Sequence, residues 1–262
     1  MRILVTNDDG IDAPALVPLA RALGSMGEVT VVVPDRERSW VGKAITRFEP
    51  VTLLETERGG MAMYETSGYP ADAVQLGMHS LGGPAPDLVV SGINLGYNHG
   101  AGFLMSSGTV GAAVEAWISG IPALAVSTGT MTDWHAWRAR AESPDSEPGW
   151  KRLADLTVSL AGSVRRSGLY GHADVVSINV PFDADDSTPR RVTTIARVGY
   201  DRLFTPDGEG RFVHGYGGGI TEFDTVEGSD IDAAHDGVVS ITPIRMPAAA
   251  DVPGEVRAVL ES

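Results

Sequence analysis

The chain has 262 residues, with 20 Lys and Arg against 34 Asp and Glu, which gives a formal net charge of −14 at pH 7. No Lys/Arg cluster forms the basic face of a generic nucleic-acid binder, so we expect no nucleic-acid polymer as a partner. Cysteine is absent, which excludes disulfides and thiolate metal sites. Because no apolar run can span a bilayer and no secretory leader opens the chain, we expect a cytoplasmic protein with no membrane partner.

The first 33 residues are typical of a βαβ unit. The β-forming run Ile3–Thr6 is followed by a polar turn and then by apolar residues at helical spacing. We predict a helix with Asp12 as its N-cap, Pro14 in its first turn and Gly24 as its stop. Glu28–Val33 is a Val-rich second strand. A strand, helix and strand in such quick succession predict a parallel sheet.

The following segments continue this α/β pattern. We predict a hairpin and three further strands, at Val51–Leu54 with Met61–Thr66, Asp87–Ser91, Ala123–Ser127 and Asp174–Val180. We predict helices at Tyr69–Leu81, Gly111–Ile118 and Lys151–Arg166. The connections are predicted at Pro34–Thr46, at the charged Glu55–Gly60, at the glycine-rich Gly92–Gly108 and at the irregular Met131–Gly149.

The pattern changes in the last third of the chain. β segments are predicted at Arg191–Tyr200, Arg211–Tyr216 and Gly237–Thr242, joined by Gly/Asp turns without regular helices between them. We therefore predict one domain over residues 1–262, with an α/β core at about 1–185 and an extension at about 186–262 that takes part in oligomer contacts.

Polar side chains follow several predicted strands at their carboxyl ends, where open α/β sheets bind ligands. Asp8 and Asp9 follow the first strand, Ser39 lies in the loop after the second, and Asn94 and Asn98 lie between glycines in the loop after Ser91. Each string by itself can be an ordinary turn or a solvated loop. Together, carboxylate, hydroxyl and amide oxygens suit Mg²⁺ or Mn²⁺.

The string Ser106–Ala113 places hydroxyl residues and glycines at the start of a predicted helix. The free N–H groups and the positive dipole end of such a helix can bind an anion, although an ordinary Ser/Thr helix cap also accounts for the string. The string lacks the lysine and the spacing of a Walker A loop. A metal ion beside this helix start would form a phosphate site.

Five strings in order resemble the SurE family, the survival protein E type of acid phosphatase and 5′-nucleotidase. They are Asn7–Gly10, Pro34–Arg36 with Ser39, Pro86–Asn94, Ser107–Ala113 and Gly237–Pro243. The resemblance implies a Rossmann-like three-layer α/β/α fold with a mainly parallel sheet and a β-rich C-terminal extension. It also implies a homodimer or homotetramer.

The resemblance also implies roles for particular residues. One divalent ion per subunit, Mg²⁺ or Mn²⁺, would be bound by Asp8, Asp9, Ser39 and Asn94. Of these residues, Asp8, Asp9 and Asn94 are the predicted catalytic ones, and Asp8 is our first choice for orienting or deprotonating the attacking water. The phosphate-binding turn would be Ser107, Gly108 and Thr109, and Asn98 would face the substrate.

Two loops depart from the family pattern. After Ser39 the string Trp40–Lys43 replaces the usual glycine and small hydroxyl residues, and Ala101–Met105 is more apolar than we would expect. Lys43 is therefore a candidate substrate-binding residue, or it pairs with Glu49 on the surface. The substrate is accordingly either a nucleoside 5′-monophosphate or a more specialised phosphomonoester.

The sequence thus predicts a metal-dependent phosphomonoesterase of the 5′-nucleotidase type. We interpret the candidate general acids His99, His135 and His235 as bystanders. The alternatives are a metal- and nucleotide-binding protein without catalysis, a haloacid-dehalogenase-like phosphatase and a receiver-like signalling module. The adjacent aspartates do not fit the Asp-x-Asp spacing of the dehalogenase type, and a receiver would be about half this length.

Overall fold

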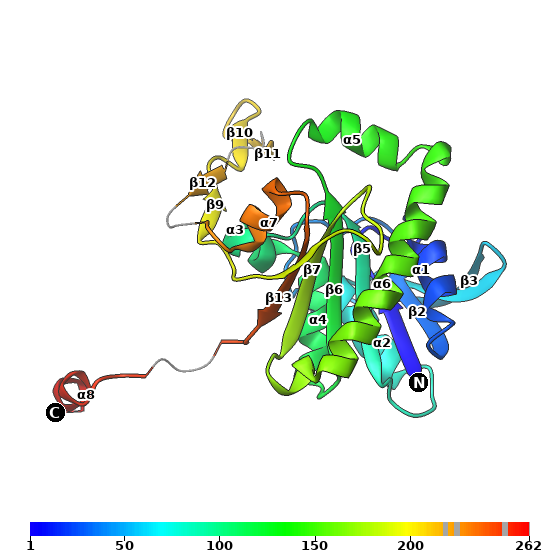
Figure 1. Cartoon of the computed structure of the whole chain (residues 1–262), viewed down its shortest axis with the longest axis horizontal. Coiled ribbons are helices and arrows are strands. Elements are labelled where there is room, and N and C mark those ends of the chain that lie inside the picture. The colour runs from blue at the N-terminus through cyan, green and yellow to red at the C-terminus, as the bar shows by residue number, and fades with distance from the viewer. Residues whose placement is uncertain (217–219, 223–225, 248–250, 262) are drawn as a thin grey trace.

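Figure 1 shows the computed structural model of the protein, which describes residues 1–216, 220–222, 226–247 and 251–261. Its centre is a nine-stranded sheet with the order β3-β4-β2-β1-β5-β6-β7-β13-β8. The strands of this sheet are β1 (Arg2–Thr6), β2 (Glu28–Pro34), β3 (Leu53–Arg58), β4 (Met61–Thr66), β5 (Leu88–Leu95), β6 (Ala123–Gly129), β7 (Val175–Pro181), β8 (Arg190–Val192) and β13 (Val239–Ile244). The pairs from β4 to β7 are all parallel, whereas β3 pairs with β4 and β13 pairs with β7 in antiparallel fashion.

Helices cover both faces of the sheet and enclose two separate apolar cores. Helices α1 (Leu16–Leu23) and α6 (Glu147–Ser167) lie on one face, and α2 (Pro70–His79) and α4 (Gly108–Ile118) lie on the other (Figure 1). The central strands β5 and β6 are buried along their whole length, as strands covered on both faces must be. The predicted three-layer, mainly parallel α/β fold is confirmed.

The first helix begins later than predicted. Its N-cap position is Ala15, which offers no side-chain cap, while Asp12 is exposed and pairs with Arg58. The prediction of Asp12 as the N-cap was therefore wrong, although Gly24 does end the helix. The predicted hairpin is present, but β3 continues through Glu55 to Arg58 because the charged side chains of this edge strand can point into solvent.

The predicted glycine-rich loop at 92–108 contains regular structure. Strand β5 continues to Leu95, with an irregular register against β6 between Ser91 and Asn94, and α3 (Gly100–Ser106) follows. Likewise α5 (Trp134–Ala141) lies in the segment predicted to be irregular. Neither helix shows clear amphipathic spacing, because α3 is rich in glycine and α5 is mostly exposed.

The last third of the chain contributes both sheet and helix. β13 and β8 join the main sheet, whereas β9 (Val198–Tyr200) pairs with β12 (Ile220–Glu222), and β10 (Phe204–Pro206) pairs with β11 (Phe212–His214). Helix α7 (Asp230–His235) lies between two of the predicted β segments and corrects the expectation that no regular helices separate them, and α8 (Gly254–Leu260) follows the last segment. None of the helices in the described part of the chain has the length and apolar character to cross a membrane.

Candidate active site

The two adjacent aspartates lie directly beyond β1, at the carboxyl edge of the sheet. Asp8 is buried, and its Oδ1 accepts a 2.6 Å hydrogen bond from the hydroxyl of Thr109. Asp9 Oδ2 accepts a 3.0 Å hydrogen bond from the backbone N–H of Leu95. The backbone of Thr109 also hydrogen-bonds to the Asp8 carboxylate. Each aspartate is thus oriented by a hydrogen bond from a neighbouring element, Asp8 from α4 and Asp9 from β5.

Burial makes the negative charges of this pair unfavourable. It raises the pKa of Asp8 to about 6, although the hydrogen bond from Thr109 opposes the shift. It also raises the pKa of Asp9 well above its ordinary value, and the neighbouring charge of Asp8 adds to that rise. A bound cation would offset both effects.

Gly10 allows the loop after β2 to lie against the aspartates. Its φ is +91°, and an added Cβ would lie 2.6 Å from the backbone carbon of Arg36, so a larger residue does not fit. The backbone N–H of Arg38 donates a 2.7 Å hydrogen bond to the carbonyl oxygen of Asp8. These contacts bring the loop that carries Ser39 next to the end of β1.

Ser39 is held by a chain of charged side chains. Its hydroxyl donates a 2.6 Å hydrogen bond to Glu37 Oε1, and Arg138 Nη2 on α5 binds Glu37 Oε2 at 3.0 Å. Arg138 Nε in turn lies 2.8 Å from Glu142 Oε1. Burial alone would raise the pKa of Glu37, but the hydrogen bonds from Ser39 and Arg138 outweigh it and hold that pKa below its usual range. The lone pairs of Ser39 remain available to a ligand.

Asn94 belongs to β5 rather than to a loop. Its side-chain Nδ2 donates a 2.6 Å hydrogen bond to the carbonyl oxygen of Gly96, and the side chain is buried. Its Oδ1 accepts no hydrogen bond from the described residues. Because Asn94 precedes Leu95, whose N–H binds Asp9, the backbone of Asn94 lies beside the acidic pair.

The predicted phosphate turn forms the start of α4. Ser107 is the N-cap, and its Oγ accepts a 3.1 Å hydrogen bond from Val110 N. Gly108 lies so close to Asp8 that an added Cβ would be 2.8 Å from Asp8 Cβ. The structure therefore brings Ser107, Gly108 and Thr109 to the aspartates, with the positive end of the helix dipole beside them.

Two other predicted residues have partners within the protein. The Asn98 side chain donates a 2.8 Å hydrogen bond to Ser127 Oγ, and the Asn98 backbone N–H donates to Asn179 Oδ1 at 2.9 Å. Lys43 Nζ lies 2.5 Å from Oε2 of Glu115, a buried residue of α4, so the suggested pairing with Glu49 was wrong. Both residues thus help to fix the loops around the site.

The donor set fits a hard divalent cation. The described residues contain no cluster of three or more His, Cys, Asp or Glu that could bind a metal. A cation here would therefore rely on the two carboxylates of Asp8 and Asp9 and on the neutral oxygens of Ser39 and Asn94. Oxygen ligands of this kind suit Mg²⁺ or Mn²⁺, which retain bound waters.

Sequence reasoning missed three residues around the site: Glu37, Arg38 and Arg138. Glu37 and Arg38 stand directly before Ser39, and this proximity is the only signal that the sequence offers for them. Arg138 lies about a hundred residues further along the chain, in the segment predicted to be irregular, and only the fold brings it to Glu37.

The fold and the site together define a class of protein. It is a Rossmann-like α/β protein whose acidic site lies at the carboxyl edge of the sheet, next to a helix N-terminus.

Comparisons with known proteins agree with this class. A family model described as "Survival protein SurE" matches residues 3–202. The chain is 40% identical over 249 residues to a protein named 5′-nucleotidase SurE from Geotalea uraniireducens, with 94% of this chain and 93% of that protein covered. It is 36% identical to a protein of the same name from Methanocella arvoryzae, covering 94% and 92%. The crystal structure of the SurE protein from Aquifex aeolicus superposes with a TM-score of 0.76 at 29% identity, covering 100% of both chains.

The chain belongs to the SurE family. The predicted family is therefore confirmed. Membership also decides against the dehalogenase-like and receiver-like alternatives.

Proposed function

We propose that this protein hydrolyses nucleoside 5′-monophosphates, or a related specialised phosphomonoester, to the alcohol and phosphate, with one divalent metal ion per subunit. It is a phosphatase of the 5′-nucleotidase type, as are its curated relatives by name. The observation that carries the proposal is the contact between Asp8 and Thr109, because it places an acidic pair beside a helix start that can receive a phosphoryl group.

Each part of the site has a role in this proposal. Asp8, Asp9, Ser39 and Asn94 would hold the ion, Mg²⁺ or Mn²⁺. When bound, such an ion polarises a phosphoryl oxygen and lowers the pKa of a bound water. The start of α4 at Ser107–Thr109 receives the charge on the equatorial oxygens through amide and hydroxyl donors. Asp8 is the residue we propose to orient or deprotonate the attacking water.

Phosphate release tests the proposal directly. A panel of nucleoside 5′-monophosphates, sugar phosphates and p-nitrophenyl phosphate is incubated with Mn²⁺, with Mg²⁺ and with EDTA. We expect release from at least one member with a metal ion and none with EDTA. Asp8→Asn should lose turnover even at saturating metal; near-normal turnover of that variant would refute the role of Asp8.

The second candidate function is metal and nucleotide binding without catalysis. Trp40 favours this reading, because it lies in the loop after Ser39 and its indole contacts Phe103, Tyr200, His214 and Tyr216. A pocket closed by these rings could bind a nucleotide and exclude the attacking water. Nucleotide binding without metal-dependent release from any member of the panel would decide for this candidate.

We also propose that the protein acts in the cytoplasm as a homodimer or homotetramer. The exposed apolar side chains of α8, among them Val256 and Leu260, support an oligomer, as does the position of this helix away from the sheet in Figure 1. The mass of the full chain in solution, measured by light scattering, tests this; a monomer at micromolar concentration would contradict it.

A further inference from the structure

A small polar pocket lies beside the candidate active site, at the carboxyl ends of β2 and β4. Its volume is about 120 Å³, and its wall includes Arg36, Arg38, Thr46, Ser67 and Tyr69. Pockets that enclose a drug-sized ligand hold about 300–1,000 Å³. This pocket can therefore take only one part of a nucleotide.

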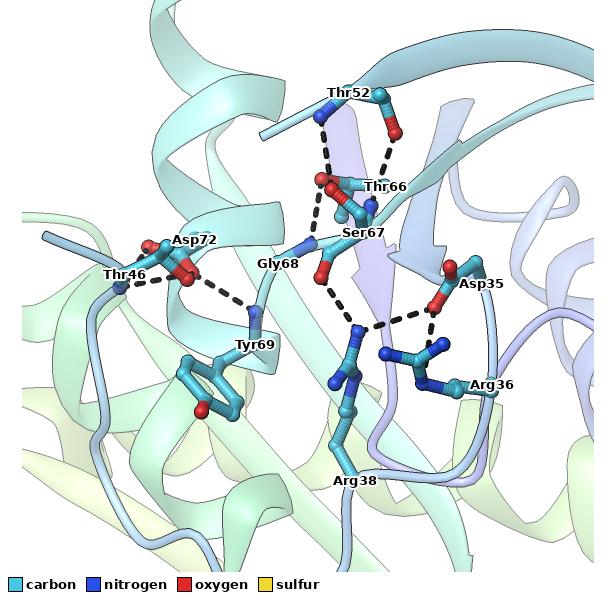
Figure 2. Close-up of polar contacts among 10 residues, drawn as sticks. All are labelled: Asp35, Arg36, Arg38, Thr46, Thr52, Thr66, Ser67, Gly68, Tyr69 and Asp72. Atoms are coloured by element: carbon cyan, nitrogen blue, oxygen red, sulfur yellow. Dashed lines mark hydrogen bonds and ion pairs between the residues drawn. The ribbon is translucent and has the colours of Figure 1, made fainter. Parts of the chain in front are cut away.

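The walls of the pocket are fixed by hydrogen bonds (Figure 2). Asp72 accepts from the hydroxyl of Thr46 at 2.6 Å and from the backbone N–H of Tyr69 at 2.8 Å, which ties the loop at Thr46 to the segment at Tyr69. Ser67, another lining residue, accepts a 3.0 Å hydrogen bond on its Oγ from Thr52 N. A pocket built in this way is organised before any ligand arrives.

Arg38 supplies unused donors to this pocket. Figure 2 shows its guanidinium group between Tyr69 and Arg36, with its carbon 5.5 Å from the centre of the Tyr69 ring. Arg38 Nη2 binds the carbonyl oxygen of Ser67 at 2.5 Å and Asp35 at 3.3 Å. Its Nε is buried and has no hydrogen-bond partner among the described residues. A buried donor without a partner is costly, so this group favours a ligand that presents acceptors.

The charged residues around the pocket indicate which kind of acceptor group a ligand would present. Asp35 lies 3.3 Å from Arg38 and 3.9 Å from Arg36, and Glu49 also lines the pocket. Two cations thus face two carboxylates, which disfavours a second phosphate group. A neutral, planar group with adjacent acceptors fits better, and the fork of an arginine matches the O6 and N7 edge of guanine.

The pocket is next to the phosphate turn. The N–H of Arg38 binds the Asp8 carbonyl oxygen, and a Cβ on Gly108 would lie 3.2 Å from Cγ of Pro70, the residue after Tyr69. We propose that this pocket binds the base of the nucleotide and selects 6-oxopurines, guanine and hypoxanthine, through Arg38. Adenine presents an amino group in place of O6 and so offers the arginine one acceptor fewer. This inference rests on the proposed function, because it concerns the substrate of the same site.

The test compares kcat/KM for GMP, IMP and AMP in the full chain with Mn²⁺. We expect GMP and IMP to exceed AMP about tenfold or more. Arg38→Lys keeps the charge but not the fork, and it should abolish most of this ratio. Arg36→Met, at a side chain that is 68% exposed, should reduce it in part. The control Arg47→Met, in the same loop but stacked on Phe48 outside the pocket, should keep the ratio.

The ratio between substrates is the readout, so a general loss of activity in a variant does not obscure it. Equal rates for GMP and AMP in the wild type, or an unchanged ratio in Arg38→Lys, would overturn the inference. Calorimetric titration of the wild type with guanosine and adenosine gives a second readout, in which guanosine should bind more tightly. If the protein hydrolyses p-nitrophenyl phosphate but cleaves GMP and AMP equally well, only the base-pocket inference is refuted. If it binds guanosine but releases phosphate from no ester, only the proposed function is refuted.

Discussion

The hydroxyl of Thr109 donates a 2.6 Å hydrogen bond to Oδ1 of Asp8 and so joins the start of α4 to the end of β1. Thr109 is fully buried. The bond orients a candidate metal ligand from a residue of the candidate phosphate turn, so the two halves of the site are not independent.

Removal of this hydroxyl should therefore weaken metal binding. In Thr109→Val the shape is nearly kept but Asp8 loses its partner, and we expect the Mn²⁺ dissociation constant to rise about tenfold or more. The free energy of unfolding should fall by about 1–3 kcal/mol. Calorimetric titration and urea denaturation measure the two effects. Thr109→Ser keeps the hydroxyl and serves as the control, and Mn²⁺ binding by Thr109→Val as tight as in this control would contradict the prediction.

Metal addition should stabilise the protein through the acidic pair. At Mn²⁺ concentrations near a hundred times Kd, linkage predicts about 2.7 kcal/mol, which corresponds to a rise in Tm of about 5 °C or more. EDTA should reverse the rise. Asp9→Asn should lose it while raising the Tm of the metal-free protein, because one of two buried like charges is removed.

The control for this measurement is Asp12→Asn, at an exposed aspartate of the same loop that pairs with Arg58. It should keep the full response to Mn²⁺. A response in Asp9→Asn equal to that of Asp12→Asn would show that the ion binds elsewhere.

The link from α5 to Ser39 should influence metal affinity at a distance. In Arg138→Met, Glu37 loses its 3.0 Å contact and holds Ser39 less firmly. We expect the Mn²⁺ dissociation constant to rise about threefold to tenfold, less than the about 10–100-fold cost of losing a direct outer-shell partner. Arg140→Met, on the same helix but paired with Asp183, is the matched control. Equal affinities in the two variants would refute the link.

Lys43 should matter for stability more than for substrate binding. Its partner Glu115 is 4% exposed, so Lys43→Met leaves a buried carboxylate without its cation. Because the Lys43 side chain is itself one-third exposed, we expect a loss of about 1–3 kcal/mol rather than the full cost of breaking a buried pair. Urea denaturation measures this loss, and KM for p-nitrophenyl phosphate should stay close to that of the wild type. A large rise in KM with unchanged stability would restore Lys43 as a substrate ligand.

The sequence predicts those features of the site that depend on one segment at a time. Hydrophobic runs indicate β1, β2, β5 and β6, and the carboxyl ends of parallel strands lie at one edge of the sheet. The placement of Asp8, Asp9 and Ser39 after these ends, and of Asn94 at the end of β5, therefore follows from the pattern. The helix start at Ser107 is likewise visible in its hydroxyl and glycine residues.

Pairings between distant segments could not be predicted in this way. The partner of Lys43 is Glu115, and nothing in the spacing of either residue favours this pair over the nearby Glu49. The same holds for Glu37 and Arg138, which meet only because α5 lies over the loop after β2. Asp12 has the right chemistry for an N-cap, but the chain turns once more before α1 begins.

Asp72 ties Thr46 to Tyr69, whereas the tip of the loop at Arg47–Pro50 is exposed. The loop is therefore anchored at Thr46 and exposed to solvent at its tip. Insertions or deletions at its tip would alter which alcohol the enzyme accepts without moving Asp8 or Asp9. For an engineer who wants new substrates from this scaffold, residues 47–50 are the place to vary length.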